Sequence, residues 1–250
     1  MGRSPTRVLA FGMAAALLAT PASAQWSITG FFGNASTAPA DLTIRSKDTD
    51  TELDLGPVSF ADESSRSPWY YGWRVTRGFE QCPWLGIEAE FIHAKAISDP
   101  NEVVRVRGRI SGQPIDLSQA LGSTLPRFEL SHGLNVLMGN AVLHWPIVRR
   151  NGQPLVEIVG RAGAGPGIPH VEATFMGHST DRYELGGWAI AGSVGADIRL
   201  SSRLSAVVDL AWTRAMLRLD LVTADLNGDF TTRHIIGGVT WRFRAQRQQP

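Results

Sequence analysis

Residues 155–175 read LVEIVGRAGAGPGIPHVEATF, and this stretch decides the interpretation of the fold. It begins with apolar residues at alternate positions, Val156 and Ile158, which is typical of a β-strand with one apolar face. The glycine- and proline-rich sequence at 163–167 then interrupts the alternation. Such residues inside a strand indicate a β-bulge or the close approach of another group. The stretch is therefore a strand with an irregular second half.

Similar alternation recurs along the chain between turn signals, and no stretch shows a sustained helical period. The sequence predicts strands at 26–34, 69–79, 84–96, 127–145, 155–175, 183–200, 204–221 and 230–243. Tight turns near residues 81, 150 and 202 alternate with longer, polar connections, of which 34–68 and 97–125 are the longest. This arrangement predicts an all-β fold, an eight-stranded antiparallel up-and-down transmembrane β-barrel of outer-membrane type.

Charged residues lie opposite the apolar face of most predicted strands, and we expect them to point into the lumen. They are Arg74, Glu88, Glu90, Glu157, Arg161, Asp197, Asp209 and Arg242. A soluble sandwich or lipocalin-like barrel, the alternative fold, would instead turn its apolar face inward and hold few interior charges. In a small membrane barrel these side chains fill the lumen as a paired polar core. Aromatic residues near both ends of the predicted strands, such as Trp241 and Trp69, predict two interfacial girdles.

Residues 1–24 combine basic residues, an apolar run and an Ala-Ser-Ala cleavage signal, which predicts a secretory signal peptide cut before Gln25. The apolar run is too short for a transmembrane helix, which needs about 20 residues. We therefore expect the barrel to occupy residues 25–243, followed by a short tail at 244–250, and to reside in the bacterial outer membrane.

The overall charge and the cysteine content narrow the expected partners and bonds. The formal net charge of +1 gives no reason to expect a nucleic-acid partner. Cys82 is the only cysteine, so no intramolecular disulfide can form. Eight strands leave a lumen too narrow to argue for transport. The expected partners are the lipids of the membrane that surrounds the barrel.

Three histidines and one glutamate form the candidate catalytic set. Strict alternation puts His93 and His132 on lipid-facing sides of their strands, and the phase of the opening stretch places His170 and Glu172 outward too. All four lie far from the tight turns, at the depth of the outer-leaflet headgroups. Imidazole titrates near neutral pH and binds metals, so the set suits a general base or a divalent metal of unspecified identity. Single interfacial histidines are usually amphipathic anchors, but grouped polar residues at membrane depth indicate function.

The strand at 127–145 is expected to turn one apolar face to lipid. That face carries Phe128, Leu130, Leu134, Val136, Met138 and Val142. Glu129, Ser131 and Asn135 fall on the opposite phase and are expected to point into the lumen.

Five basic residues are candidates for binding lipid phosphate. Arg105, Arg107 and Arg109 lie on one side of an extended ribbon in a predicted connection, and Lys95 and Arg127 flank it. Guanidinium groups bind phosphate through two hydrogen bonds, which suits phosphorylated lipid heads. A solvated extracellular hairpin is the alternative interpretation.

Three sequence pieces carry a resemblance to a known family. They are FIHAK at 91–95 with the following Asp-Pro, FELSHGLN at 128–135, and Gly-Ala-Gly at 163–165 with IPHVE at 168–172. In these pieces the sequence resembles the outer-membrane lipid A oxidase-like proteins of rhizobia, and the resemblance extends from about residue 69 to residue 243. It implies an oxygen-dependent oxidation of the proximal glucosamine of lipid A to an aminogluconate unit in the outer membrane. It implies no residue roles, so the candidate site rests on position alone.

Two further functions remain open from the sequence. One is a non-enzymatic barrel of structural or adhesion type whose loops bind a surface partner. The other is hydrolysis of a lipid A acyl chain, which needs a Ser-His-carboxylate set. Ser131 and His132 are consecutive, and consecutive strand residues face opposite ways, which argues against the hydrolase.

Overall fold

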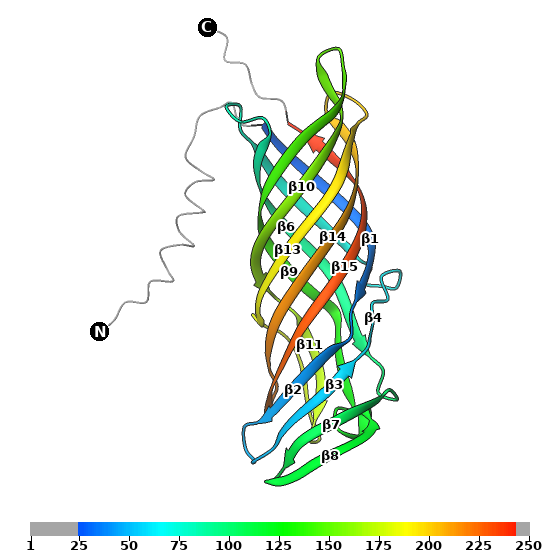
Figure 1. Ribbon diagram of the computed structural model, residues 1–250, viewed down its shortest axis with the longest axis vertical. Helices are drawn as coiled ribbons and strands as arrows, with labels where there is room; N and C mark the ends of the chain where they lie inside the picture. The colour runs from blue at the N-terminus through cyan, green and yellow to red at the C-terminus, as the bar shows by residue number, and fades with distance from the viewer. Residues whose placement is uncertain (1–24, 244–250) are drawn as a thin grey trace, which may run out of the picture.

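The computed structural model describes residues 25–243, which form a closed ring of eight antiparallel strands (Figure 1). The predicted signal peptide and the predicted tail lie outside the described residues. In ring order the strands are β1 (Gln25–Thr37), β5 (Tyr71–Gly78), β6 (Leu85–Ser98), β9 (Arg127–Arg150), β10 (Gln153–Gly167), β13 (Gly187–Arg199), β14 (Leu204–Asp220) and β15 (Ala224–Arg242). Pairing of β15 with β1 closes the ring. The predicted up-and-down barrel is confirmed.

Tight turns join neighbouring ring strands at one end of the barrel, where β1 begins and β15 ends (Figure 1). At the β9–β10 turn, Asn151 and Gly152 have φ angles of 50° and 75°. Positive φ at both central residues is the geometry of the two-residue hairpin turn that Asn-Gly favours. The turns predicted near residues 81, 150 and 202 are confirmed.

At the other end the wall continues beyond the ring as additional strands (Figure 1). From β15 the sheet extends through β2 (Ala40–Ser46), β3 (Glu52–Val58), β7 (Val103–Ile110) and β8 (Gln113–Ala120). A hairpin of β11 (His170–Phe175) and β12 (His178–Tyr183) pairs with β9, and β4 (Phe60–Ala61) pairs with β6. A short 3₁₀ turn covers Leu121–Ser123. The predicted long connections are thus largely strands, because alternate residues such as Leu42, Leu53 and Val104 are buried.

A network of ion pairs fills the middle of the lumen. The side chain of Arg74 is fully buried and donates hydrogen bonds to Glu90 at 2.7 Å and to Asp209 at 2.5 Å. Arg161 pairs with Asp209 at 2.9 Å and with Glu88 at 3.1 Å. The predicted inward charges that form luminal ion pairs are Arg74, Glu88, Glu90, Arg161, Asp197, Asp209 and Arg242. Buried charges of opposite sign satisfy one another here, as the sequence predicts.

An apolar core fills the lumen beneath the additional strands. Its largest side chains include Phe31, Phe128 and Phe230, which are at most 1% exposed. The prediction for the apolar face of 127–145 is wrong, because these residues are buried inside: Phe128, Leu130, Leu134, Val136, Met138 and Val142. Apolar residues occupy both faces of β9, since its outer face also carries the exposed Leu137, Leu143 and Trp145. Apolarity alone therefore does not identify the lipid-facing side.

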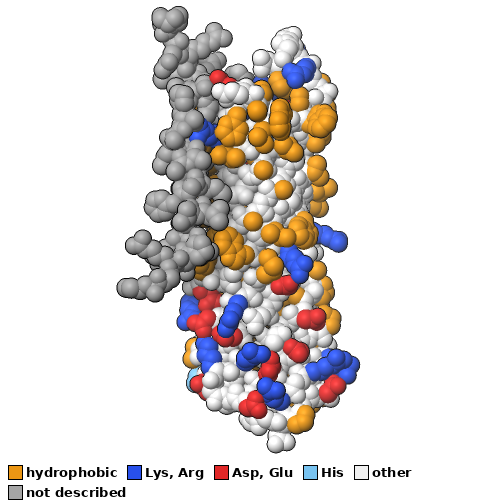
Figure 2. All heavy atoms as spheres, turned by 60° about the vertical axis from the view of Figure 1, so that its left-hand side comes forward, with side chains coloured by type: hydrophobic (Ala, Val, Ile, Leu, Met, Phe, Trp, Pro, Cys, Tyr) orange, Lys and Arg blue, Asp and Glu red, His pale blue; other side chains and the backbone are white. Residues whose placement is uncertain are grey.

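The outer surface divides into an apolar band and a charged end. Figure 2 shows hydrophobic side chains over the upper part of the barrel wall and alternating charges over the lower part. Exposed aromatic residues at the two edges of the band are Trp84, Trp145, Trp241 and Phe243 near the tight turns, and Trp69, Tyr71 and Trp188 toward the other end. An apolar band with aromatic edges is the outer surface of a transmembrane barrel. Among residues 25–243, no helix is long and apolar enough to cross a membrane.

Arg74→Met tests the luminal network. It leaves Glu90 and Asp209 buried with less compensation, so we expect the free energy of unfolding to fall by about 3–5 kcal/mol. Urea unfolding of the barrel in lipid vesicles, followed by tryptophan fluorescence, measures this change. Arg214→Met is the control, because its pair with Asp229 is about half-exposed and such pairs contribute about 1 kcal/mol or less. Equal effects of the two substitutions would contradict the assignment of the network as a stabilising core.

Candidate functional site

A bulge in β9 places two polar residues on the outer face of the barrel. Ser131, His132 and Gly133 of β9 oppose the single Lys95 of β6. Gly133 has a φ of 130°, a conformation that favours glycine. Ser131 and His132 consequently both contact the same outward carboxylate. The expectation that these consecutive residues face opposite ways is wrong, because the bulge interrupts the alternation.

The bulge also corrects the predicted orientation of neighbouring polar residues. Glu129 and Asn135 were expected in the lumen with Ser131, but they lie on the outward phase. Glu129 pairs with Arg127 at 3.1 Å, and Asn135 is hydrogen-bonded to His93. The inward positions between them belong to the apolar residues of the core. Polar residues of this segment therefore gather at the outer rim.

The glycine-rich end of β10 packs directly against β9. A Cβ on Gly163 would lie 2.0 Å from Asn140 Oδ1, and one on Gly165 would lie 1.8 Å from the Leu137 carbonyl oxygen. This is the close approach predicted from the sequence. β10 ends at Gly167, where its pairing with β13 also ends. The next strand, β11, pairs with β9 and β12 instead. The break thus directs the side chains of β11 beside the β9 bulge.

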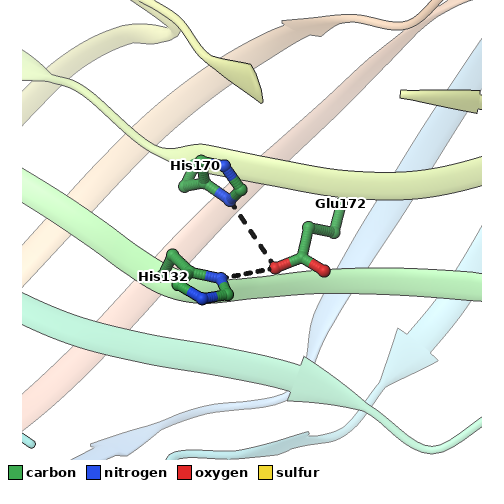
Figure 3. A group of neighbouring side chains, drawn as sticks. All are labelled: His132, His170 and Glu172. Carbon is green, nitrogen blue, oxygen red and sulfur yellow. Dashed lines mark hydrogen bonds and ion pairs between the residues drawn. The ribbon is translucent and has the colours of Figure 1, made fainter. Parts of the chain in front are cut away.

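Two histidines and one glutamate meet at this point (Figure 3). His132 Nδ1 donates a hydrogen bond to Glu172 Oε1 at 2.8 Å, and His170 Nδ1 lies 3.6 Å from the same oxygen. The Ser131 hydroxyl donates to Glu172 Oε1, and Arg127 donates to Glu172 Oε2. One ligand atom from each of His132, His170 and Glu172 lies within 4.8 Å of the others. Within residues 25–243 this is the one histidine, cysteine and carboxylate group with metal-binding spacing.

The cluster is covered on one side and open on the other. The side chain of Glu172 is 5% exposed and that of His170 is 13% exposed, whereas that of His132 is 58% exposed. The β11–β12 hairpin lies in the charged end, beyond the apolar band. Burial raises the pKa of the Glu172 carboxyl, but hydrogen bonds from Ser131 and His132 and the charge of Arg127 together leave its pKa below the ordinary value. The lowered pKa favours the ionised form of Glu172 beside the two imidazole rings.

Two residues of β12 border the cluster and were not predicted from the sequence. Asp181 Oδ1 lies 3.1 Å from His170 Nε2. The Tyr183 ring packs on His170 with 4.4 Å between centroids, and its hydroxyl donates to the His132 carbonyl oxygen at 3.1 Å. The turn at Met176-Gly177, with positive φ at both residues, is the sequence signal that would have located this hairpin.

His93 faces outward as predicted, but it does not join the group. It is 4% exposed, and its ring stacks on Tyr71 with 4.9 Å between centroids. Its Nδ1 is 2.8 Å from Asn135 Oδ1. Of the predicted set of four, the structure brings together His132, His170 and Glu172, and catalytic roles for all four remain predictions.

The five predicted phosphate-binding cations are not gathered into one patch. Arg105 binds a carboxylate on β8 through two hydrogen bonds of 2.9 Å, and Arg107 lies 3.7 Å from the same carboxylate. Arg109 pairs with Asp50, which precedes β3, and with Glu52 at the start of β3. Lys95 is buried and donates to backbone carbonyls of the 63–66 loop. Arg127 alone lies at the candidate site.

Comparisons with known proteins assign no family to this chain. The sequence matches no protein-family model, and no curated protein matches it. The match to Neisserial surface protein A covers 88% of this chain and 99% of that protein's chain, with 7% identity and a TM-score of 0.41. The match to the outer membrane protein AlkL covers 93% of this chain and 96% of the AlkL chain, with 11% identity and a TM-score of 0.43. OprG from Pseudomonas aeruginosa covers 89% and 95%, with 13% identity and a TM-score of 0.39. These values carry no information on activity.

Gly133→Ala tests the bulge. A Cβ there would lie 2.3 Å from Asn135 Oδ1, and the φ of 130° disfavours any side chain. We expect the free energy of unfolding to fall by about 1–3 kcal/mol, as for strained backbone positions, measured by urea unfolding in vesicles. Gly160→Ala is the matched control, because a Cβ there meets no atom within 4 Å. An equal loss of unfolding free energy in Gly133→Ala and Gly160→Ala would contradict this account of the bulge.

Proposed function

We propose that this barrel oxidises the proximal glucosamine of lipid A at the outer rim, using molecular oxygen and a divalent metal ion. The observation that carries the proposal is the group of His132, His170 and Glu172, whose ligand atoms lie within 4.8 Å of one another on the outer face. The resemblance to lipid A oxidase-like proteins supplies the reaction type, and its matching pieces include all three residues.

The three residues fit a metal ion of the kind proposed. Two imidazoles and one carboxylate are the donor set of non-haem iron enzymes that use oxygen. His170 Nδ1 is buried without a hydrogen-bond partner, which leaves a nitrogen free to coordinate. His132 Nδ1 and Glu172 Oε1, which are 2.8 Å apart, would hold the ion together with His170 after loss of the proton between them. A bound ion of this kind supplies a redox centre at which oxygen accepts electrons.

The proposed reaction balances with oxygen as the oxidant. The anomeric carbon of a glucosamine with a free anomeric hydroxyl loses two electrons and two protons, and oxygen accepts them to form hydrogen peroxide. Water then opens the resulting lactone to give the aminogluconate unit. Lipid A thus gains one oxygen atom overall.

The position of the cluster supports a lipid substrate. It lies just beyond the apolar band, where the glucosamine headgroups of the outer leaflet lie, and it opens outward through the half-exposed His132. The lumen is filled by ion pairs and by the apolar core, so the approach is from the side of the barrel. Arg127, about half-exposed beside Glu172, is the cation that we propose contacts a phosphate of the lipid substrate.

The acyl-chain hydrolase is a second candidate because the bulge removes the objection to it. Ser131 Oγ lies 3.2 Å from His132 Nδ1, and Glu172 Oε1 lies 2.8 Å from the same nitrogen. In a Ser-His-carboxylate triad the hydroxyl and the carboxylate contact different ring nitrogens. Here both contact Nδ1, so the arrangement favours the metal site.

Mass spectrometry of lipid A from expressing cells, grown in air and without oxygen, tests the proposal. The wild type is expected to add one oxygen atom in air only, and His170→Ala and Glu172→Gln are expected to reduce the product below detection because each removes a ligand. His178→Ala is the control, since this exposed histidine of the same hairpin lies outside the group.

Two other outcomes would replace the proposal. Loss of an acyl chain would support the hydrolase. Unchanged lipid A, with a folded barrel in the outer membrane, would support the non-enzymatic barrel whose extracellular strands bind a surface partner.

A further inference from the structure

We infer that Asp181 and Tyr183 are positioning residues that set His170 to bind a metal ion through Nδ1. This inference rests on the proposed function for the identity of the site, and it adds which nitrogen coordinates and which residues of β12 hold it there.

The hairpin register places both residues opposite the ligands. His170 is the cross-strand partner of Tyr183, and Glu172 is the cross-strand partner of Asp181. Directly opposed residues of an antiparallel pair share one face of the sheet. The four side chains therefore form a single outward group, and β12 serves as its outer wall.

The two nitrogens of His170 have different surroundings. Nε2 lies 3.1 Å from Asp181 Oδ1, and an ionised carboxylate accepts hydrogen bonds only. A carboxylate at this distance favours the tautomer with its proton on Nε2, and in that tautomer the lone pair lies on Nδ1. Nδ1 is buried, has no hydrogen-bond partner and lies 3.6 Å from Glu172 Oε1. Leaving a buried polar atom unpaired costs free energy, and a metal ion between these atoms would remove that cost.

Metal-binding histidines in proteins commonly donate their second N–H to a carboxylate. That hydrogen bond fixes the tautomer and the ring orientation, and it raises the basicity of the coordinating nitrogen. Here Asp181 is the carboxylate beside His170 Nε2, and His170 Nδ1 faces Glu172, on the side proposed for the metal ion.

Tyr183 holds the two histidines in register. Its ring packs edge-on against His170, at an interplanar angle of 64°, and its hydroxyl binds the backbone of His132 in the β9 bulge. The His132 and His170 rings lie 5.0 Å apart between centroids. Among the described strands, β12 pairs with β11 alone. The Tyr183 hydroxyl therefore connects β12 to β9, the strand that carries His132.

Binding of Co²⁺ alone to the folded, detergent-solubilised barrel tests the inference, with calorimetry for affinity and visible absorption for the ligand set. Asp181→Asn is expected to weaken Co²⁺ binding about 10–100-fold, the usual effect of losing such a partner. Tyr183→Phe keeps the ring and removes the hydrogen bond to His132, so we expect a weaker loss and an altered absorption spectrum. Asp229→Asn is the control, an exposed acid on β15 paired with Arg214.

Nitrogen NMR of the metal-free wild type provides a measurement that needs no variant. The His170 ring is expected as the Nε2–H tautomer. A proton on Nδ1, or Co²⁺ affinity unchanged in Asp181→Asn, would overturn the inference. Failure to bind Co²⁺ in the wild type would overturn both this inference and the metal site. Co²⁺ binding that weakens as expected, with lipid A unchanged in cells, would uphold the inference and overturn the proposed oxidation.

Discussion

Closure of the backbone hydrogen-bond ring is the constraint on which the rest of the structure depends. No water is available inside the bilayer to satisfy a free strand edge, so β15 must pair with β1. Eight strands enclose a space only wide enough for side chains. Paired charged residues fill the middle of this space, and apolar residues fill the end beneath the additional strands. A closed and filled interior leaves the outside of the wall as the place for a lipid-facing site.

The candidate site arises where the strand ladder becomes irregular. The bulge at 131–133 and the break after Gly167 lie on neighbouring strands, and together they turn His132, His170 and Glu172 toward one point. A regular ladder would have kept Ser131 and His132 on opposite faces. Irregular backbone is tolerated here because the hairpin of β11 and β12 supplies new partners for β9.

The sequence predicts the barrel better than it predicts the site. Alternation, tight turns and inward charges suffice for the eight strands, because side-chain direction in a ladder follows from position alone. The face of 127–145 was mispredicted because the core outside the bilayer is apolar, like the lipid on the other side. Asp181 is not predicted because its place depends on a hairpin register. The pairing of Arg109 is not predicted either, because its acidic partners lie more than 50 residues earlier in the chain.

The filled lumen also matters to a cell that inserts many copies of the barrel. Ions cross a wide, water-filled barrel readily, whereas the middle of this lumen is occupied by the buried ion pairs around Arg74. A filled lumen of this kind is therefore expected to add protein surface to the membrane without adding conductance.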